Sequence, residues 1–159
     1  MKRVLIISYY WPPSGGPGVQ RWLKFVKYLP EYNIEPILFV PKNANYPLID
    51  NSLAEQVDTG LKVISHPITE ISKFLPKFKF LKSARAGNIS IPANQSFFQK
   101  VFFFIRGNLF IPDMKIFWKN SSVNFLSDYI SKNNIDAIIT TGPPHSVHLI
   151  GLELKRKLD

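Results

Sequence analysis

The sequence contains no cysteine, so disulfide-stapled scaffolds, thiolate metal sites and cysteine nucleophiles are excluded. It also lacks any run of the ~20 apolar residues that a membrane-spanning helix requires. The first apolar run, residues 4–7, is too short for a secretory signal, and YYWPP (residues 9–13) stands where a small-residue cleavage site would be needed. We therefore expect a cytoplasmic protein, with peripheral association at the inner face of the membrane as an open alternative.

Standard motifs for nucleotide binding and hydrolysis are also missing. There is no GxGxxG at the spacing of dinucleotide-binding proteins, no GK[ST] ending of a P-loop and no GxSxG nucleophile elbow. No acidic residue near the end of the second expected strand is placed to bind a ribose. A nucleotide-dependent oxidoreductase is therefore disfavoured, and a Ser-His-Asp hydrolase is unsupported.

The length and composition are those of one globular domain. The chain has 159 residues, of which 45% are apolar and 19% charged, a balance typical of a protein that buries a core. We therefore predict a single α/β domain over residues 1–159.

The net charge of +9 lies almost entirely in the middle of the chain. Residues 61–119 carry ten Lys and Arg against two Asp and Glu, and they also hold ten of the thirteen Phe. Such a segment fits an anionic membrane surface or, alternatively, a helix buried against the sheet with its cations reaching solvent. Nucleic acid is not expected as a partner, because no recognised binding motif accompanies the charge. The cations expected to form an acceptor or membrane surface are Lys77, Lys79, Lys82, Lys100 and Arg106.

Short apolar runs alternate with stretches of helical periodicity along most of the chain. The expected strands are residues 3–8, 34–40, 61–65 and 135–141, and the expected helices are residues 19–29, 118–131 and 147–158. This alternation predicts a Rossmann-like parallel sheet flanked by helices on both faces. Residues 69–111 are less regular, with a short helical piece over 74–81, a loop over 87–93 and an aromatic helix over 97–109.

Two loops rich in glycine and proline, residues 9–18 and 141–146, follow expected strands. Ligands of a doubly wound sheet bind beyond the carboxyl ends of its strands. Gly15 and Gly16 would let a ligand approach the main chain, and the helix that follows offers unpaired N–H groups and a positive dipole end to a phosphate. The alternative is a proline-stiffened turn with no ligand. We predict that the two loops open onto a common face.

The second loop carries His145, three residues before His148. His145 could position or deprotonate a sugar hydroxyl, or it could simply decorate the start of a helix. No metal site is expected, because the pair lacks a nearby third ligand and His66 is distant in sequence. Asp113 could accept a hydroxyl, but its setting is more typical of a cap or turn residue.

The segment VLIISYYWPP (residues 4–13), followed by Gly15-Gly16 and Val19-Gln20-Arg21, resembles the opening of family 4 glycosyltransferases of the GT-B architecture. The segment DAIITTGPPHS (residues 136–146) is similar to the loop that those enzymes place beside their cleft. The resemblance implies the N-terminal, acceptor-side half of an enzyme that transfers a sugar from a nucleotide-diphosphate donor to a glycan or lipid-linked acceptor, with retention. It implies neither a metal nor another cofactor.

The same resemblance implies roles for single residues. Gly15 and Gly16 would lie against the donor diphosphate, His145 would face the transferred sugar as a catalytic residue, and residues 69–110 would select the acceptor. The family's donor-binding half, with its pair of glutamates about two helical turns apart, is absent, so the chain alone is expected to be inactive. The alternative function is a non-catalytic α/β module that binds a membrane or a protein partner.

Overall fold

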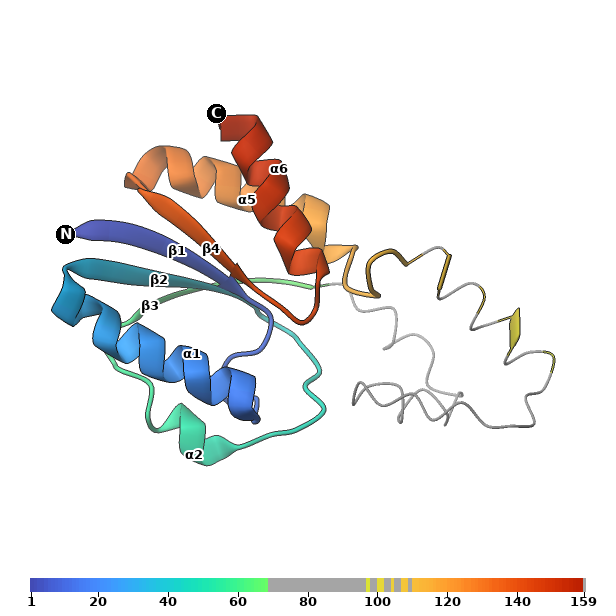
Figure 1. The fold of residues 1–159 in the computed structure, drawn as a ribbon, viewed down its shortest axis with the longest axis horizontal. Coiled ribbons are helices and arrows are strands. Elements are labelled where there is room, and N and C mark those ends of the chain that lie inside the picture. Colours follow the sequence, from blue (N-terminus) through green and yellow to red (C-terminus); the bar gives the residue numbers. More distant parts are fainter. Residues whose placement is uncertain (69–96, 98–99, 102–103, 105–106, 109, 159) are drawn as a thin grey trace.

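The sheet consists of four parallel strands in the order β3-β2-β1-β4 (Figure 1). In chain order they are β1 (Lys2–Ser8), β2 (Ile34–Pro41), β3 (Lys62–His66) and β4 (Ala137–Thr141). The computed structural model describes residues 1–68, 97, 100–101, 104, 107–108 and 110–158. The predicted α/β fold with a Rossmann-like parallel sheet is confirmed.

Strand β1 lies inside the sheet because its side chains are buried on both faces. Leu5 and Ile7 pack into one hydrophobic cluster, whereas Val4 and Ile6 pack into the other. An apolar run without polar alternation needs cover on both sides, which a central strand of a two-faced sheet provides.

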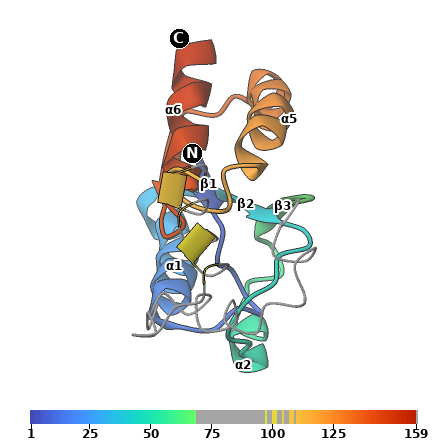
Figure 2. The same ribbon diagram turned by 90° about the vertical axis from the view of Figure 1, so that its right-hand side faces the viewer.

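Helices cover both faces of the sheet (Figure 1). One face carries α1 (Pro17–Tyr28), the 3₁₀ turn η1 (Leu29–Tyr32) and the short α2 (Asn51–Ala54). The other face carries α5 (Trp118–Asn133) and α6 (Ser146–Leu158). Figure 2 shows α5 and α6 side by side, across the sheet from α2.

Most observed boundaries lie within two residues of the predicted ones. Helix α1 begins earlier than expected, at Pro17, because proline is well tolerated at the first helical position. Strand β4 begins later, at Ala137, although Asp136 already joins the sheet edge: its N–H donates to the Arg3 carbonyl at 2.9 Å and its carboxylate accepts from the Arg3 N–H at 2.7 Å. The elements α2 and η1 were not predicted.

The expected helical piece over 74–81 and the loop over 87–93 lie outside the described residues. Within the expected helix over 97–109, the described positions 97, 100, 101, 104, 107 and 108 are all helical. None of the helices in the described part of the chain is long and apolar enough to cross a membrane.

Candidate functional site

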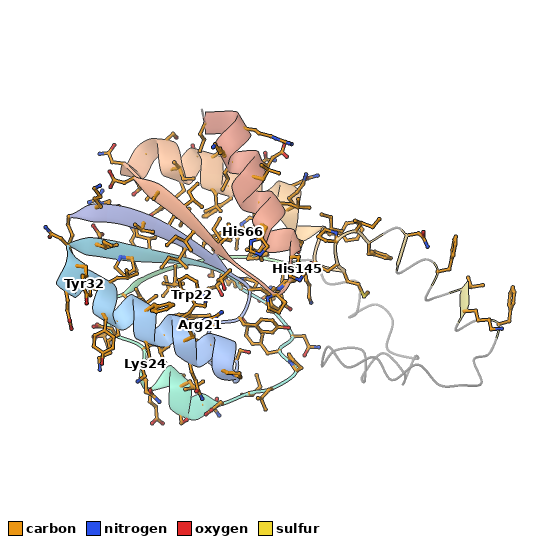
Figure 3. The ribbon with its side chains drawn as sticks, in the orientation of Figure 1. Arg21, Trp22, Lys24, Tyr32, His66 and His145 are labelled. Atoms are coloured by element: carbon orange, nitrogen blue, oxygen red, sulfur yellow. The ribbon has the colours of Figure 1, made fainter. Side chains whose placement is uncertain are left out.

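The loops after β1 and β4 leave the sheet at the same edge. These strands are neighbours, and their last residues, Ser8 and Thr141, are directly paired in the parallel register. Figure 3 shows His145 at this edge. The predicted common edge is therefore present, and the two loops can contribute to one site beyond the carboxyl ends of the strands.

Gly15 ties the first loop to the segment that follows β2. Its N–H donates to the Leu48 carbonyl at 3.0 Å, and the Asp50 N–H donates to the Pro13 carbonyl at 2.8 Å. A Cβ at position 15 would lie 3.0 Å from the Leu48 side chain, tighter than an ordinary contact. The amide of Gly15 is therefore occupied, and this glycine serves close packing rather than an anion.

Gly16 is the N-cap of α1 and has a different environment. Its φ of 115° and ψ of 162° belong to a region that only glycine adopts readily. Its carbonyl accepts from the N–H groups of Val19 and Gln20 at 3.1 and 3.2 Å. A Cβ built on Gly16 or on Gly18 would meet no atom within 4 Å, so both positions face open space.

The amides at this helix end remain available. Pro17 has no N–H, and within the described residues neither Gly16 nor Gly18 donates its N–H to a backbone carbonyl. The α1 N-terminus has no side-chain cap, and the hydroxyl of Ser14 is buried without a described partner. Unpaired N–H groups at the positive end of a helix dipole favour an anion.

The start of α6 differs, because a carboxylate already occupies it. Asp113 accepts from the Ser146 N–H at 2.7 Å and from the Ser146 hydroxyl at 2.9 Å. It also accepts from the Lys115 N–H at 2.8 Å. The expected role of Asp113 as a cap and turn residue is confirmed, and of the two helix starts only that of α1 is open.

Two imidazoles converge on Gly142 in the second loop. A Cβ there would lie 2.8 Å from His148 Nε2 and 3.4 Å from His145 Nδ1, so a larger residue at this position would displace the imidazoles. Both histidines are exposed, but His148 Nδ1 lies 2.9 Å from the Thr140 hydroxyl, which orients that ring. The two ring centroids are 5.9 Å apart. Of the pair, His145 is therefore the ring left free to contact a ligand.

Aromatic rings are stacked near the same edge, on the face covered by α5. Phe39 lies parallel to Trp118 with ring centroids 5.2 Å apart, and His66 stacks on Phe125 at 5.0 Å. Burial lowers the pKa of His66, so its neutral form is favoured. From sequence, His66 was considered only as a metal ligand and was too distant from His145 and His148 to serve as one. Its place in this stack was not predicted, although Phe39 and His66 both lie near the ends of expected strands.

A groove of about 550 Å³ runs along the outer side of β4. Thr140, His148 and Gly151 line it, together with apolar residues of α5 and α6. Gly16 is not among its lining residues, so this groove is distinct from the open helix start at α1.

Of the cations predicted to form an acceptor or membrane surface, the structure describes one. Lys77, Lys79, Lys82 and Arg106 lie outside the described residues, whereas Lys100 is an exposed, helical residue. In the described part of the chain, no three His, Asp or Glu side chains cluster as metal ligands.

Comparisons with protein-family models, with curated proteins and with solved structures gave no significant match. The function must therefore be inferred from the site itself.

Proposed function

We propose that this chain is the N-terminal, acceptor-side domain of a sugar-nucleotide glycosyltransferase. The observation that carries the proposal is the pairing of Ser8 with Thr141. It places the loops of residues 9–18 and 141–146 at the same edge of the sheet. One loop supplies an uncapped helix start and the other an exposed imidazole. A helix start can bind a diphosphate, and an imidazole can hold a hydroxyl of the adjoining sugar.

The donor diphosphate is proposed to lie at the start of α1. The open N–H groups of Gly16 and Gly18 would donate to phosphate oxygens, supported by the helix dipole. Because the amide of Gly15 is engaged by Leu48, the contact expected at Gly15 is moved to Gly18. Most of the donor's affinity would come from the second half of the enzyme, as the resemblance to family 4 implies.

His145 is proposed to contact a hydroxyl of the transferred sugar. An imidazole can donate or accept a hydrogen bond at neutral pH, which suits a hydroxyl that must be held in one orientation. The acceptor, a glycan or a lipid-linked glycan, is proposed to bind through residues 69–110. Transfer would retain the anomeric configuration and use no metal, as in the family that the sequence resembles.

Binding of a nucleoside diphosphate tests the site at α1. Gly16→Asp and Gly16→Asn introduce side chains of equal size with similar backbone preferences, but only Asp adds a negative charge where the phosphates would lie. We expect Gly16→Asp to weaken binding of UDP or GDP at least tenfold more than Gly16→Asn, measured by calorimetry on the enzyme with its donor-binding half. Equal affinities of the two variants would remove the diphosphate from this helix start.

Sugar transfer tests His145. We expect His145→Ala to lower kcat by about a hundredfold, the lower range for a lost general acid–base or orienting group, with little change in nucleotide affinity. The control is His66→Gln, which removes an imidazole that lies on the α5 face of the sheet, stacked on Phe125. Full activity of His145→Ala would withdraw the catalytic role.

A second candidate is a non-catalytic module that binds a membrane or a protein partner. It is favoured by Phe97 and Phe104, which are 75% and 70% exposed on helical residues either side of the exposed Lys100. A helix that displays aromatic rings beside a cation suits an interface with anionic lipid. This candidate predicts no affinity for nucleoside diphosphates, so the UDP measurement separates the two functions.

A further inference from the structure

The outward side of α1 is as distinctive as its packed side. Val19, Leu23 and Val26 are buried against the sheet. At 100° per residue, the opposite side of the helix carries Arg21, Lys24, Phe25 and Tyr28. Figure 3 shows Arg21 and Lys24 on this outer layer, with Tyr32 beyond them on η1.

Three aromatic rings stand out from this layer. Phe25 is 52% exposed, Tyr28 48% and Tyr32 75%. Phe25 contacts Trp22 edge-on, with ring centroids 5.5 Å apart, so a neighbouring ring supports it. Together these side chains form what we call the α1 ridge, made of Arg21, Lys24, Phe25, Lys27, Tyr28 and Tyr32. Isolated exposed apolar residues are ordinary, but three rings along one helix and its extension mark an interaction surface.

The cations of the α1 ridge have no ion partners in the described part of the chain. Lys24 reaches only the Gln56 amide oxygen, at 3.4 Å, and Lys27 lies over the Tyr28 ring at 5.8 Å. Glu31 is the acidic side chain on α1 and η1, against three cations. The ridge is therefore complementary in charge to an anionic partner.

We propose that the α1 ridge docks on an anionic lipid bilayer, through residues other than those of the basic segment 61–119. Phe25, Tyr28 and Tyr32 would enter the headgroup layer, where aromatic rings are favoured, and the three cations would meet lipid phosphates. A bilayer fits better than single-stranded nucleic acid, because the ridge residues lie on α1 and its extension η1 at the outside of the sheet (Figure 1), whereas such nucleic acids are bound in a groove that tracks the phosphate backbone.

Vesicle flotation of the full chain tests the charge of the α1 ridge. We expect binding to vesicles of phosphatidylcholine mixed equally with phosphatidylglycerol, and none to phosphatidylcholine alone. Replacing Arg21, Lys24 and Lys27 together by Gln should lower binding roughly a hundredfold, since each cation near such a surface contributes about fivefold. The matched control replaces three exposed cations of α6 by Gln: Lys155, Arg156 and Lys157.

A second set of variants tests the aromatic rings of the α1 ridge. Phe25→Ser with Tyr28→Ser should also release the chain from mixed vesicles, whereas Leu152→Ser, at a 45% exposed residue of α6, should not. The proposal is overturned if the α6 control loses as much binding as the ridge variant, since net charge alone would then suffice. It is equally overturned if the chain binds oligothymidylate but not mixed vesicles. Affinity for UDP is measured in parallel, so failure of the ridge and failure of the transferase proposal remain separate.

Discussion

Asp113 holds the first turn of α6 from 33 residues upstream: its carboxylate accepts from the Ser146 N–H at 2.7 Å and from the Ser146 hydroxyl at 2.9 Å. A charged acceptor at a helix N-terminus satisfies an otherwise unpaired amide and opposes the positive end of the dipole. The same contact joins the segment before α5 to the loop that carries His145. Asp113 is therefore a positioning residue for that loop.

Removal of this cap should destabilise the protein. We expect Asp113→Ala to lower the free energy of unfolding by about 1–2 kcal/mol, the cost of losing an N-cap together with a charge-assisted bond. Asp128→Ala is the control, because its exposed pair with Lys132 within α5 should contribute no more than about 0.5 kcal/mol. Urea unfolding measures both. Equal losses in the two variants would contradict the role of Asp113.

Gly15→Ala should destabilise the protein through a close steric contact, and a second substitution should relieve that contact. The added Cβ would lie 3.0 Å from the Leu48 side chain and 3.1 Å from the Asp50 Cβ, so these neighbours would have to shift, at a cost of about 1 kcal/mol. Leu48 is 56% exposed, so Leu48→Ala alone should be mild. In the Leu48→Ala background, the cost of Gly15→Ala should fall by roughly half, since the Asp50 Cβ remains close. The double-mutant cycle is measured by urea unfolding. If it shows no coupling between the two substitutions, the loop moves away from Leu48 and relieves the contact by itself.

Gly16 and Gly18 should respond to alanine in opposite directions. Gly16→Ala should cost about 1–3 kcal/mol, because a φ of 115° is strained for any residue with a Cβ. Gly18 lies inside α1 with open space around it, so Gly18→Ala should stabilise by about 0.5 kcal/mol through higher helix propensity. Thermal unfolding of the two variants compares them directly. A gain in stability for Gly16→Ala would mean that the start of α1 has another conformation.

Local pattern was sufficient to predict most of the fold. The unbroken apolar run of β1 indicated a central strand, and the repeat of Val19, Leu23 and Val26 indicated the packed side of α1. In contrast, no local pattern distinguishes Gly15 from Gly16. Their difference depends on where Leu48 lies, which is a matter of tertiary structure.

Contacts between distant segments were the part that sequence could not supply. Asp113 was expected to be a cap or turn residue, but nothing in the sequence indicated which helix it would cap. The stack of Phe39 on Trp118 joins β2 to α5 across about half of the chain, and each of the two is an ordinary apolar residue when read alone. The exposure of the aromatic rings of the α1 ridge could not be predicted either. A helical repeat indicates which side of the helix is apolar, but not how much of each side chain is exposed to solvent.

The stability of the protein should fall in mild acid through His66. Burial lowers the pKa of this imidazole below its ordinary value of 6.5, so the unfolded chain binds the proton more tightly than the folded one. The favourable contribution of neutral His66 is therefore present above pH 6.5 and is lost as the pH falls below that value. His66→Phe keeps a ring between Phe39 and Phe125 and should remove this part of the pH dependence. Identical profiles of unfolding free energy from pH 7.5 to 5.5 for the parent protein and His66→Phe would contradict this role of His66.

Gly151 should be required by the close approach of α6 to β4, and one methyl group should account for the requirement. A Cβ at position 151 would lie 2.6 Å from Thr140 Cγ2, whereas the other Thr140 atoms lie at 3.8 Å, an ordinary contact. We therefore expect Gly151→Ala to destabilise by about 1–3 kcal/mol, although alanine favours a helix. Thr140→Ser removes Cγ2 but keeps the hydroxyl that bonds His148 Nδ1 at 2.9 Å.

In the Thr140→Ser background, Gly151→Ala should become neutral or stabilising by up to about 1 kcal/mol, because only the helix propensity of alanine remains. The double-mutant cycle is measured by urea unfolding. Since His148 keeps its hydroxyl partner, the geometry around Gly142 should survive in the double variant. A Gly151→Ala cost that persists in both backgrounds would mean that α6 is held against β4 by contacts other than this methyl.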